Sequence, residues 1–298
     1  MKTSMSNFRW IICSLLFFAT TVNYLDRQVL SLTYKDYIAP VFGWDDNDYG
    51  TITAVFSIIY ALCNLFAGKF IDWLGTKKGY LWAIFIWSLA ACLHASCGVG
   101  TQALKSVGFL GMMGITTSVW LFIACRAVLA LGEAGNFPAA IKVTAEYFPA
   151  KDRAFATSIF NAGSSVGALA APLSIPPIAK FFGWETAFIV IGALGFVWMG
   201  FWMWLYSKPS GNPRVNAAEL SYIRQDDCDA KKSEQAQDTA EDTQKPMSFI
   251  QCFRQRQTWS LILGRFLTDG VWWFFLFWTP SYLSDQFGYT SSSGMGMA

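Results

Sequence analysis

The sequence predicts an all-α membrane protein built as a bundle of seven membrane-spanning helices. Its 298 residues are 54% apolar and only 14% charged, whereas about 25% of the residues of a soluble domain are charged. Apolar runs near or above the roughly 20 residues that cross a bilayer recur seven times along the chain. Each run should be a helix, because a segment in lipid must satisfy its own backbone hydrogen bonds. This composition excludes an ordinary soluble enzyme.

The predicted spans follow one another from the N-terminus. The first has no turn residue before Pro40, and no small-x-small cleavage site follows it, so we interpret it as an uncleaved span rather than a secretory signal. A turn at Gly75 separates the second span from the third, and a polar stretch separates the sixth from the seventh. The expected spans are residues 8–38, 48–71, 79–97, 118–148, 152–182, 184–206 and 258–285.

The polar stretch, residues 208–257, contains eight Lys or Arg and eight Asp or Glu with few large apolar side chains. It is expected to be a cytoplasmic linker whose charges are solvated. The predicted domains are therefore a six-helix N-terminal bundle (1–207), the linker (208–257) and the first helix of a truncated C-terminal bundle (258–298). With the N-terminus in the cytoplasm, the inside segments carry fourteen Lys and Arg against three outside, which favours that orientation.

Four charged residues inside the predicted spans are the clearest functional signal, because a charge at the bilayer centre costs several kcal/mol without a partner or a wet cavity. Asp26 and Arg27 lie near the middle of the first span, and Glu133 lies near the middle of the fourth. Arg126 precedes Glu133 by seven residues, on the same helical face. These residues either form two internal ion pairs that hold helices together, or surround a binding cavity.

In a binding cavity, arginine would recognise an anion and a carboxylate would take a coupling proton. A guanidinium is always charged, and its planar fork fits a carboxylate in two places. If the carboxylate of a substrate occupies the arginine, the protein carboxylate loses its partner and tends to take up a proton. Anion and proton binding would then favour each other, as symport requires.

Other side chains near these charges can complete a binding cavity. Arg265 and Asp269 are four residues apart on the seventh span and are expected to pair with each other, which orients both. Trp273 can stack on the face of a sugar. Small polar residues can bind sugar hydroxyls, although each alone is typical of contacts between transmembrane helices. The candidates are Asn23, Tyr24, Tyr60, Asn161, Ser164 and Ser165, and the glycines that permit close helix approach are Gly132, Gly135, Gly163 and Gly167.

A motif stands between the second and third spans. Gly68, Asp72, Gly75, Lys77 and Lys78 form the pattern G-x-x-x-D-x-x-G-x-K-K, which resembles the signature of the major facilitator superfamily at the same loop. The turn reverses the chain, and Asp72 can pair with a base or cap a neighbouring helix end. The resemblance implies that this loop is a cytoplasmic gate latch rather than a substrate site.

Three other stretches narrow the resemblance. Residues 23–27 and 126–138 are similar to the anion:cation symporter family, and residues 265–278 are similar to its bacterial hexuronate transporter branch. On the seventh span the resemblance implies proline after the Thr-Asp pair, whereas this chain has Gly270.

By the same resemblance, Asp26 and Glu133 would be the protonation sites and Arg27 the contact for a substrate carboxylate. Arg126 would balance the charge of Glu133. Further residues would line the sugar-acid cavity, namely Tyr24, Tyr60, Asn161 and Ser164.

The resemblance implies a protein of the bacterial inner membrane that is monomeric and imports a sugar-acid anion by proton symport. The substrate would be a hexuronate such as glucuronate or galacturonate, or an aldonate. Family members hold it between two six-helix halves. Because spans eight to twelve do not follow here, we expect either a truncated reading frame or a half-transporter that assembles with another chain, and no transport by this chain alone.

Two other functions stay open. Antiport of an organophosphate against phosphate would also use buried arginine, but Asp26 and Glu133 would repel a dianion. A non-transporting fragment or a sensor is the third interpretation. Sodium coupling is a further alternative, although the absence of an oxygen-rich cation cage favours a proton.

No nucleophile, phosphate loop or metal cluster in the sequence indicates an enzyme, so no cofactor or metal site is expected. The seven cysteines form no CxxC pair, and the single histidine, His94, should be a packing or interfacial residue. Lys and Arg form no basic stripe, so nucleic acid is not an expected partner.

Overall fold

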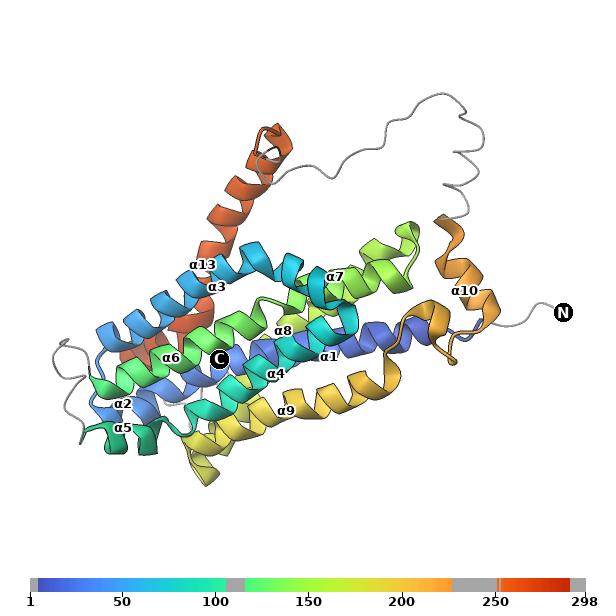
Figure 1. Ribbon diagram of the computed structural model, residues 1–298. Helices are drawn as coiled ribbons and strands as arrows, with labels where there is room; N and C mark the ends of the chain where they lie inside the picture. Colours follow the sequence, from blue (N-terminus) through green and yellow to red (C-terminus); the bar gives the residue numbers. More distant parts are fainter. Residues whose placement is uncertain (1–4, 106–115, 227–250, 252, 290–298) are drawn as a thin grey trace.

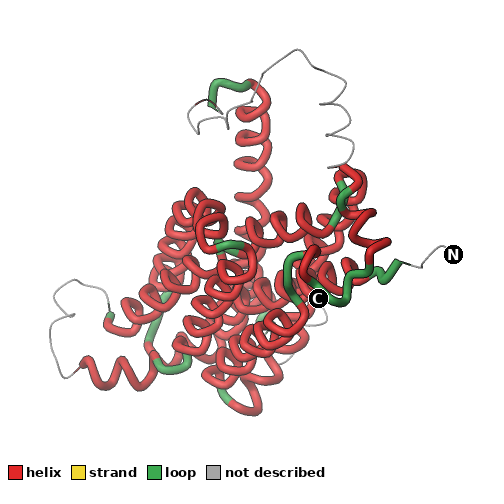
Figure 2. Tube along the Cα trace, turned by 45° about the vertical axis from the view of Figure 1, so that its right-hand side comes forward, coloured by secondary structure: helices red, strands yellow, loops and turns green. Residues whose placement is uncertain are grey.

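The computed structural model describes residues 5–105, 116–226, 251 and 253–289, and all regular secondary structure in these residues is helical. Six of the described helices are long and apolar enough to cross a membrane, or seven when the bent pair Thr76–His94 and Cys97–Leu104 counts as one. Figure 1 shows an elongated bundle of helices from which the last helix rises, and Figure 2 shows only helices and connecting loops from a second direction. The predicted all-α class is confirmed.

The helices of the first half are α1 (Phe8–Thr33), the π-helical turn η1 (Tyr34–Ile38), α2 (Ala39–Phe42), α3 (Asp46–Leu74), α4 (Thr76–His94), α5 (Cys97–Lys105) and α6 (Thr117–Glu133). They are followed by α7 (Asn136–Tyr147), α8 (Ala150–Phe182), α9 (Trp184–Leu205), the short 3-10 turn η3 (Pro209–Gly211), α10 (Ala217–Ile223) and α13 (Arg256–Phe287).

The sequence explains where several helices begin and end. At the start of α3, the backbone N–H of Asp48 donates to the Asp45 carboxylate over 2.9 Å, and the reciprocal contact completes a capping box. This hydrogen bond holds the pKa of Asp45 below its usual value. Between α3 and α4, Gly75 has a φ of +77°, a conformation that glycine adopts without strain. The predicted chain reversal at Gly75 is confirmed.

Three predicted spans differ in detail from the helices. The first continues through η1 and α2 to Phe42. The third is a straight helix only to His94, and after a bend of 62° the chain continues as α5. The fourth is interrupted at Ala134 and Gly135, where α6 ends and α7 begins. This break follows Glu133 directly.

Two apolar clusters stabilise the bundle, one toward each of its ends. One contains the first half of α1 together with residues of α4, α7 and α9, and the other contains the second half of α1 with residues of η1, α3 and α9. On α6, Leu129 belongs to the first cluster and Phe122 to the second, and Arg126 lies between them. The buried charges therefore occupy the boundary between two cores, where apolar side chains separate them from both ends.

Helix α1 lies along α8 at very short range (Figure 1). A Cβ atom added at Gly163 would lie 2.5 Å from the carbonyl oxygen of Phe17, and one at Gly167 would lie 2.6 Å from that of Thr21. These contacts are with backbone atoms, which must move to admit any side chain. The prediction that these glycines permit close helix approach is confirmed.

Helix α13 contacts the bundle mainly through its C-terminal half. Its N-terminal half rises away from the other helices (Figure 1), with Phe266 and Leu267 exposed. Further along, Leu276 and Phe277 are buried, and the Tyr49 hydroxyl donates to the carbonyl oxygen of Phe277 over 2.9 Å. This arrangement leaves space between α13 and the bundle near the buried charges.

The first part of the predicted linker is docked rather than solvated. On α10, the carboxylate of Glu219 accepts backbone N–H groups of Phe8 and Arg9 over 3.0 and 3.1 Å and pairs with the Arg9 guanidinium over 3.2 Å. Glu219 is completely buried, so the expectation of solvated charges is wrong at this residue. Its carboxylate lies at the start of α1 because a negative charge stabilises the N-terminus of a helix. Residues 227–250 and 252 of the linker lie outside the described residues.

We predict that Gly163→Ala destabilises the protein in detergent by about 1–3 kcal/mol, because a methyl group there overpacks the α1–α8 contact. Gly200→Ala is the matched control, since a Cβ atom at Gly200 of α9 has no neighbour within 4 Å. Thermal unfolding followed by size-exclusion chromatography measures both. Equal unfolding midpoints for the two variants would contradict the close packing.

Candidate functional site

A cavity of about 680 Å³ lies between the bundle and α13. Its wall is formed by α1, α3, α7, α8 and α13, so residues far apart in the sequence meet there. The lining residues are Tyr24, Arg27, Tyr60, Asn64, Phe137, Asn161, Ser164, Arg265, Thr268, Asp269, Trp272 and Trp273. Eight of these twelve are residues that the sequence singled out. The volume is within the range of small-molecule sites.

Arg27 and Glu133 form a buried ion pair at the inner wall of the cavity. Both Nε and Nη2 of Arg27 lie close to one carboxylate oxygen, Oε2 of Glu133, at 2.9 and 2.5 Å. Both side chains are at most 1% exposed. The pair joins α1 to α6 across 106 residues of sequence. One of the two predicted internal ion pairs is therefore present, and its arginine also borders the cavity.

Aromatic rings enclose the Arg27 guanidinium. Its central carbon lies 4.7 Å from the ring centroid of Tyr60, 4.7 Å from that of Trp273 and 5.1 Å from that of Tyr24. Rings at this range attract a cation through their π faces and exclude water from it. Trp273 lines the cavity, and its ring covers the arginine.

Asp26, Arg126 and Asn23 lie behind the cavity wall, in the interior of the bundle. They are 2%, 3% and 0% exposed, and none of them lines the cavity. Among the described residues, both carboxylate oxygens of Asp26 and both amide atoms of Asn23 lack a hydrogen-bond partner. A second internal ion pair is absent from the described chain, because Asp26 and Arg126 form no salt bridge there, although the two charges interact electrostatically. Asn23 is thus not placed to bind a ligand in this cavity.

Arg126 interacts electrostatically with Glu133, but the hydrogen bonds of that carboxylate in the described chain come from Arg27. The other oxygen of Glu133, Oε1, is buried without a hydrogen-bond partner there. Glu133 therefore has one oxygen bonded to the cavity arginine and a second that is free to accept another hydrogen bond.

Helix α8 contributes polar groups from one face. Asn161 and Ser164 line the cavity, with the Ser164 hydroxyl donating to the Asn161 carbonyl oxygen over 2.7 Å. Ser165 is exposed and does not line it, because one further residue turns the side chain by about 100° around the helix. Ser165 is therefore not brought to the cavity with its two neighbours.

Arg265 and Asp269 of α13 form the predicted pair along one helix, with 3.1 Å between Nη1 and Oδ1. Both line the cavity, yet their side chains are 78% and 46% exposed. An exposed pair of this kind contributes little to stability. It places one positive and one negative group on the side of the cavity opposite Arg27.

Four lining residues were not singled out from the sequence, namely Asn64, Phe137, Thr268 and Trp272. Asn64 lies one helical turn after Tyr60, and its side-chain amide donates to the Tyr60 carbonyl oxygen over 2.8 Å. That spacing could have identified it, because residues four apart share a helical face. Thr268 and Trp272 each adjoin a residue that was identified.

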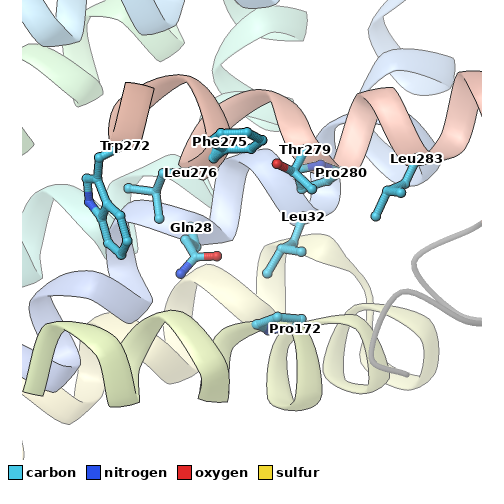
Figure 3. A pocket seen from close by; sticks show the side chains of 9 residues that line it. All are labelled: Gln28, Leu32, Pro172, Trp272, Phe275, Leu276, Thr279, Pro280 and Leu283. Atoms are coloured by element: carbon cyan, nitrogen blue, oxygen red, sulfur yellow. The ribbon is translucent and has the colours of Figure 1, made fainter. Parts of the chain in front are cut away.

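A second cavity of about 430 Å³ lies between α1, α8 and the later part of α13. Figure 3 shows Gln28, Leu32, Pro172 and the α13 residues around it. Its lining is mostly apolar and contains no charged side chain. It shares Trp272 with the larger cavity but offers no group that would hold an anion.

The signature loop makes cross-helix contacts at the end of the bundle where the chain begins (Figure 1). Asp72 pairs with Lys142 of α7 at 2.6 Å, so the prediction that it pairs with a base is confirmed. Lys77 donates to the carbonyl oxygen of Met203 in α9 over 3.2 Å. Gly68 lies within α3 and Lys78 is exposed on α4. None of the motif residues lines the large cavity.

The chain matches known transporters over nearly its whole length. A galacturonate transporter of Dickeya chrysanthemi is 30% identical over 281 residues, which are 94% of this chain and 73% of the relative. A hexuronate transporter of Escherichia coli strain K12 is 30% identical over 286 residues, with 94% and 59% covered. A probable galactarate/D-glucarate transporter of the same strain is 31% identical over 285 residues, with 94% and 60% covered. The chain thus spans between 59 and 73% of the length of these three relatives.

A solved structure has a similar fold. It is the crystal structure of a bacterial homologue of the human lysosomal transporter Spinster, in an inward-facing and unoccupied conformation. The TM-score is 0.67 at 19% identity, with 97% of this chain and 58% of that chain covered.

The family model described as the Major Facilitator Superfamily matches residues 16–298. The family and the relatives are transporters, not enzymes. On the match of the family model, the helical architecture and the identity to these relatives, this chain belongs to the Major Facilitator Superfamily.

Proposed function

We propose that this chain supplies the N-terminal substrate-binding half of a secondary active transporter that imports a sugar-acid anion together with a proton. The substrate would be a hexuronate such as glucuronate or galacturonate, or an aldonate. The observation that carries the proposal is the Arg27–Glu133 pair at the wall of a polar cavity. The names of the relatives, which include galacturonate and hexuronate transporters, support the same substrate class.

Arg27 would recognise the carboxylate of the substrate. Its guanidinium borders the cavity and is held by a single oxygen of Glu133, so an incoming carboxylate competes directly with Glu133. The surrounding rings keep water away from the contact, which strengthens a charge-assisted hydrogen bond. Binding of the anion thus displaces the carboxylate of the protein from its cation.

Displacement of Glu133 would couple the anion to a proton. A buried carboxylate without its cationic partner is costly, and taking up a proton removes that cost. Asp26 is a second buried carboxyl group in electrostatic contact with Glu133. Either carboxyl group can therefore hold the proton while the other carries the negative charge. Because each ligand favours the other, the two would be carried together.

Polar and aromatic groups around the cavity would select the sugar part of the substrate. Asn64 and Asn161 offer amides, and Ser164 and Thr268 offer hydroxyls. Such groups discriminate strongly between substrates when they are desolvated on binding, because a substrate that lacks the matching hydroxyl leaves them unpaired. Arg265 opposite Arg27 would complement any second negative group.

The transporter would lie in the bacterial inner membrane with its N-terminus in the cytoplasm. This orientation follows from the distribution of Lys and Arg. The Asp72–Lys142 contact would then lie at the cytoplasmic end, where it could hold α3 against α7 as the gate closes. Alternating access would arise from rocking of this bundle against the second half of the transporter.

We expect that cells expressing the complete gene accumulate radiolabelled galacturonate or glucuronate when an inward pH gradient is present. A protonophore should abolish accumulation, because the gradient supplies the driving force for symport. Failure to accumulate either acid would contradict the proposed substrate class. Uptake that follows a sodium gradient instead would contradict proton coupling.

In this assay, Glu133→Gln should abolish accumulation driven by the pH gradient and retain exchange of labelled for unlabelled substrate. The amide fills the same space and cannot release a proton. Glu185→Gln at the start of α9, outside the cavity, is the matched control and should behave as the unmodified protein. Gradient-driven accumulation by Glu133→Gln would exclude Glu133 as a coupling group.

Arg27→Lys should weaken substrate binding by about 10- to 100-fold, because lysine keeps the charge but loses the planar fork. The apparent affinity from uptake at several substrate concentrations measures this change. Lys180→Gln removes an exposed charge outside the cavity and should leave the affinity unchanged. An unchanged affinity in Arg27→Lys would show that another group binds the carboxylate.

A further inference from the structure

The single histidine of the chain lies in the interior of the bundle, at the end of α4. His94 is completely buried. Its ring stacks on Phe188 with a centroid distance of 5.0 Å and an interplanar angle of 3°, and it meets the edge of Phe122 at 5.7 Å. These two rings fix the plane of the imidazole. His94 is a packing residue, as the sequence predicts, but the packing gives one of its ring nitrogens no hydrogen-bond partner among the described residues.

The hydrogen bond of His94 determines its tautomer. Nδ1 lies 2.7 Å from the carbonyl oxygen of Ala90, and a carbonyl oxygen only accepts, so Nδ1 carries the proton. In the neutral ring Nε2 then holds a lone pair. Among the described residues, Nε2 is buried without a hydrogen-bond partner. His94 therefore presents a fixed acceptor to the interior of the bundle.

Arg126 follows Phe122 by one helical turn on α6 and carries hydrogen-bond donors. Its Nε and Nη1 are buried and have no hydrogen-bond partner in the described chain, and its guanidinium lies 5.5 Å from the ring centroid of Phe56. The charged and titratable groups in electrostatic contact with Arg126 lie on α1, α3, α4 and α6. They are Asp26 and Arg27 of α1, Tyr49 of α3, His94 of α4, and Cys125 and Glu133 of α6.

Unpaired buried donors and acceptors are costly, so such groups in proteins almost always find a partner or an ordered water. In this interior, His94 offers a neutral acceptor with a fixed direction. Asp26 and Glu133 offer carboxylate oxygens that compete for the same guanidinium. The position of Arg126 therefore depends on how these acceptors share its donors.

We propose that His94 is a positioning residue that accepts a hydrogen bond from Arg126 at Nε2, directly or through one water molecule, and so limits how tightly Arg126 engages Asp26. The histidine stays neutral throughout. Its part in transport rests on the proposed function, in which Asp26 takes up a proton. Without this acceptor, Arg126 would turn to Asp26 and hold that carboxylate charged to a lower pH.

The first test is independent of transport. Because the chain has one histidine, labelling with ¹⁵N-histidine gives the two ring nitrogens of His94 alone in a nuclear magnetic resonance spectrum of the purified protein. We expect a protonated Nδ1, an unprotonated Nε2 and no titration between about pH 5 and 8, since burial disfavours the charged ring. A protonated Nε2, or a titration in this range, would overturn the proposal.

The same spectrum tests the partner. Arg126→Gln should move the Nε2 resonance, and Arg126→Lys, which keeps a donor, provides a second variant if the first does not fold. Arg265→Gln on exposed α13 is the matched control and should leave the resonance in place. An Nε2 resonance that is the same in folded Arg126→Gln and in the unmodified protein would also overturn the proposal.

The second test measures the pH dependence of uptake. His94→Phe keeps the ring and removes the acceptor, and it should shift the pH profile by about one unit toward acid. His94→Gln, which places an amide oxygen near Nε2, should restore the profile. Loss of packing alone would lower uptake at every pH without a shift, and that result would overturn the positioning role.

The two tests separate the possible failures. If the Nε2 resonance shifts in Arg126→Gln but uptake needs no proton, the contact is supported and the proposed coupling is overturned. A resonance that does not respond, in a protein with proton-driven uptake, would overturn the contact and leave the proposed function standing.

Discussion

The buried ion pair between Arg27 and Glu133 is the constraint on which the rest of the site depends. Its two members lie on α1 and α6 and are nearly inaccessible to solvent, where separating the charges would be far more costly than at a surface. The pair fixes Arg27 at the cavity wall and directs one oxygen of Glu133 toward the Arg27 guanidinium. A pair of this kind is weak evidence for stability alone. Its position beside a polar cavity gives it a chemical role that a purely structural pair would not have.

The packing of the bundle creates the environment that the pair requires. Apolar clusters lie toward both ends, so the charges occupy a layer between them, where the effective dielectric constant is low. The backbone contact of α1 with α8 at Gly163 and Gly167 fixes the face of α1 that carries Tyr24 and Arg27 toward the cavity. Asn23 and Asp26 each precede one of these residues by one position, which turns a side chain by about 100° around the helix, so they do not line the cavity.

The site therefore has two compartments with different solvation. In the cavity, Arg27 meets polar groups of α3, α8 and α13. In the interior, Asp26, Arg126 and His94 are enclosed by the bundle, with hydrogen-bonding atoms that have no partner in the described chain. Glu133 belongs to both compartments, since one oxygen binds Arg27 and the other faces no donor there. A change of charge in the cavity therefore changes the electrostatic energy of the charged groups in the interior, because little solvent screens the interaction.

The sequence by itself determined the helical class, the approximate spans and most of the cavity residues, because a bilayer demands long apolar segments and makes every charge inside them conspicuous. It also indicated the Arg265–Asp269 pair, which depends only on helical spacing. Only the tertiary structure decided that Glu133 binds Arg27 rather than Arg126, that Ser165 and Asn23 lie outside the cavity, and that Glu219 caps α1. Those outcomes depend on the rotation of each helix about its axis and on contacts between distant segments, which hydrophobic patterning does not specify.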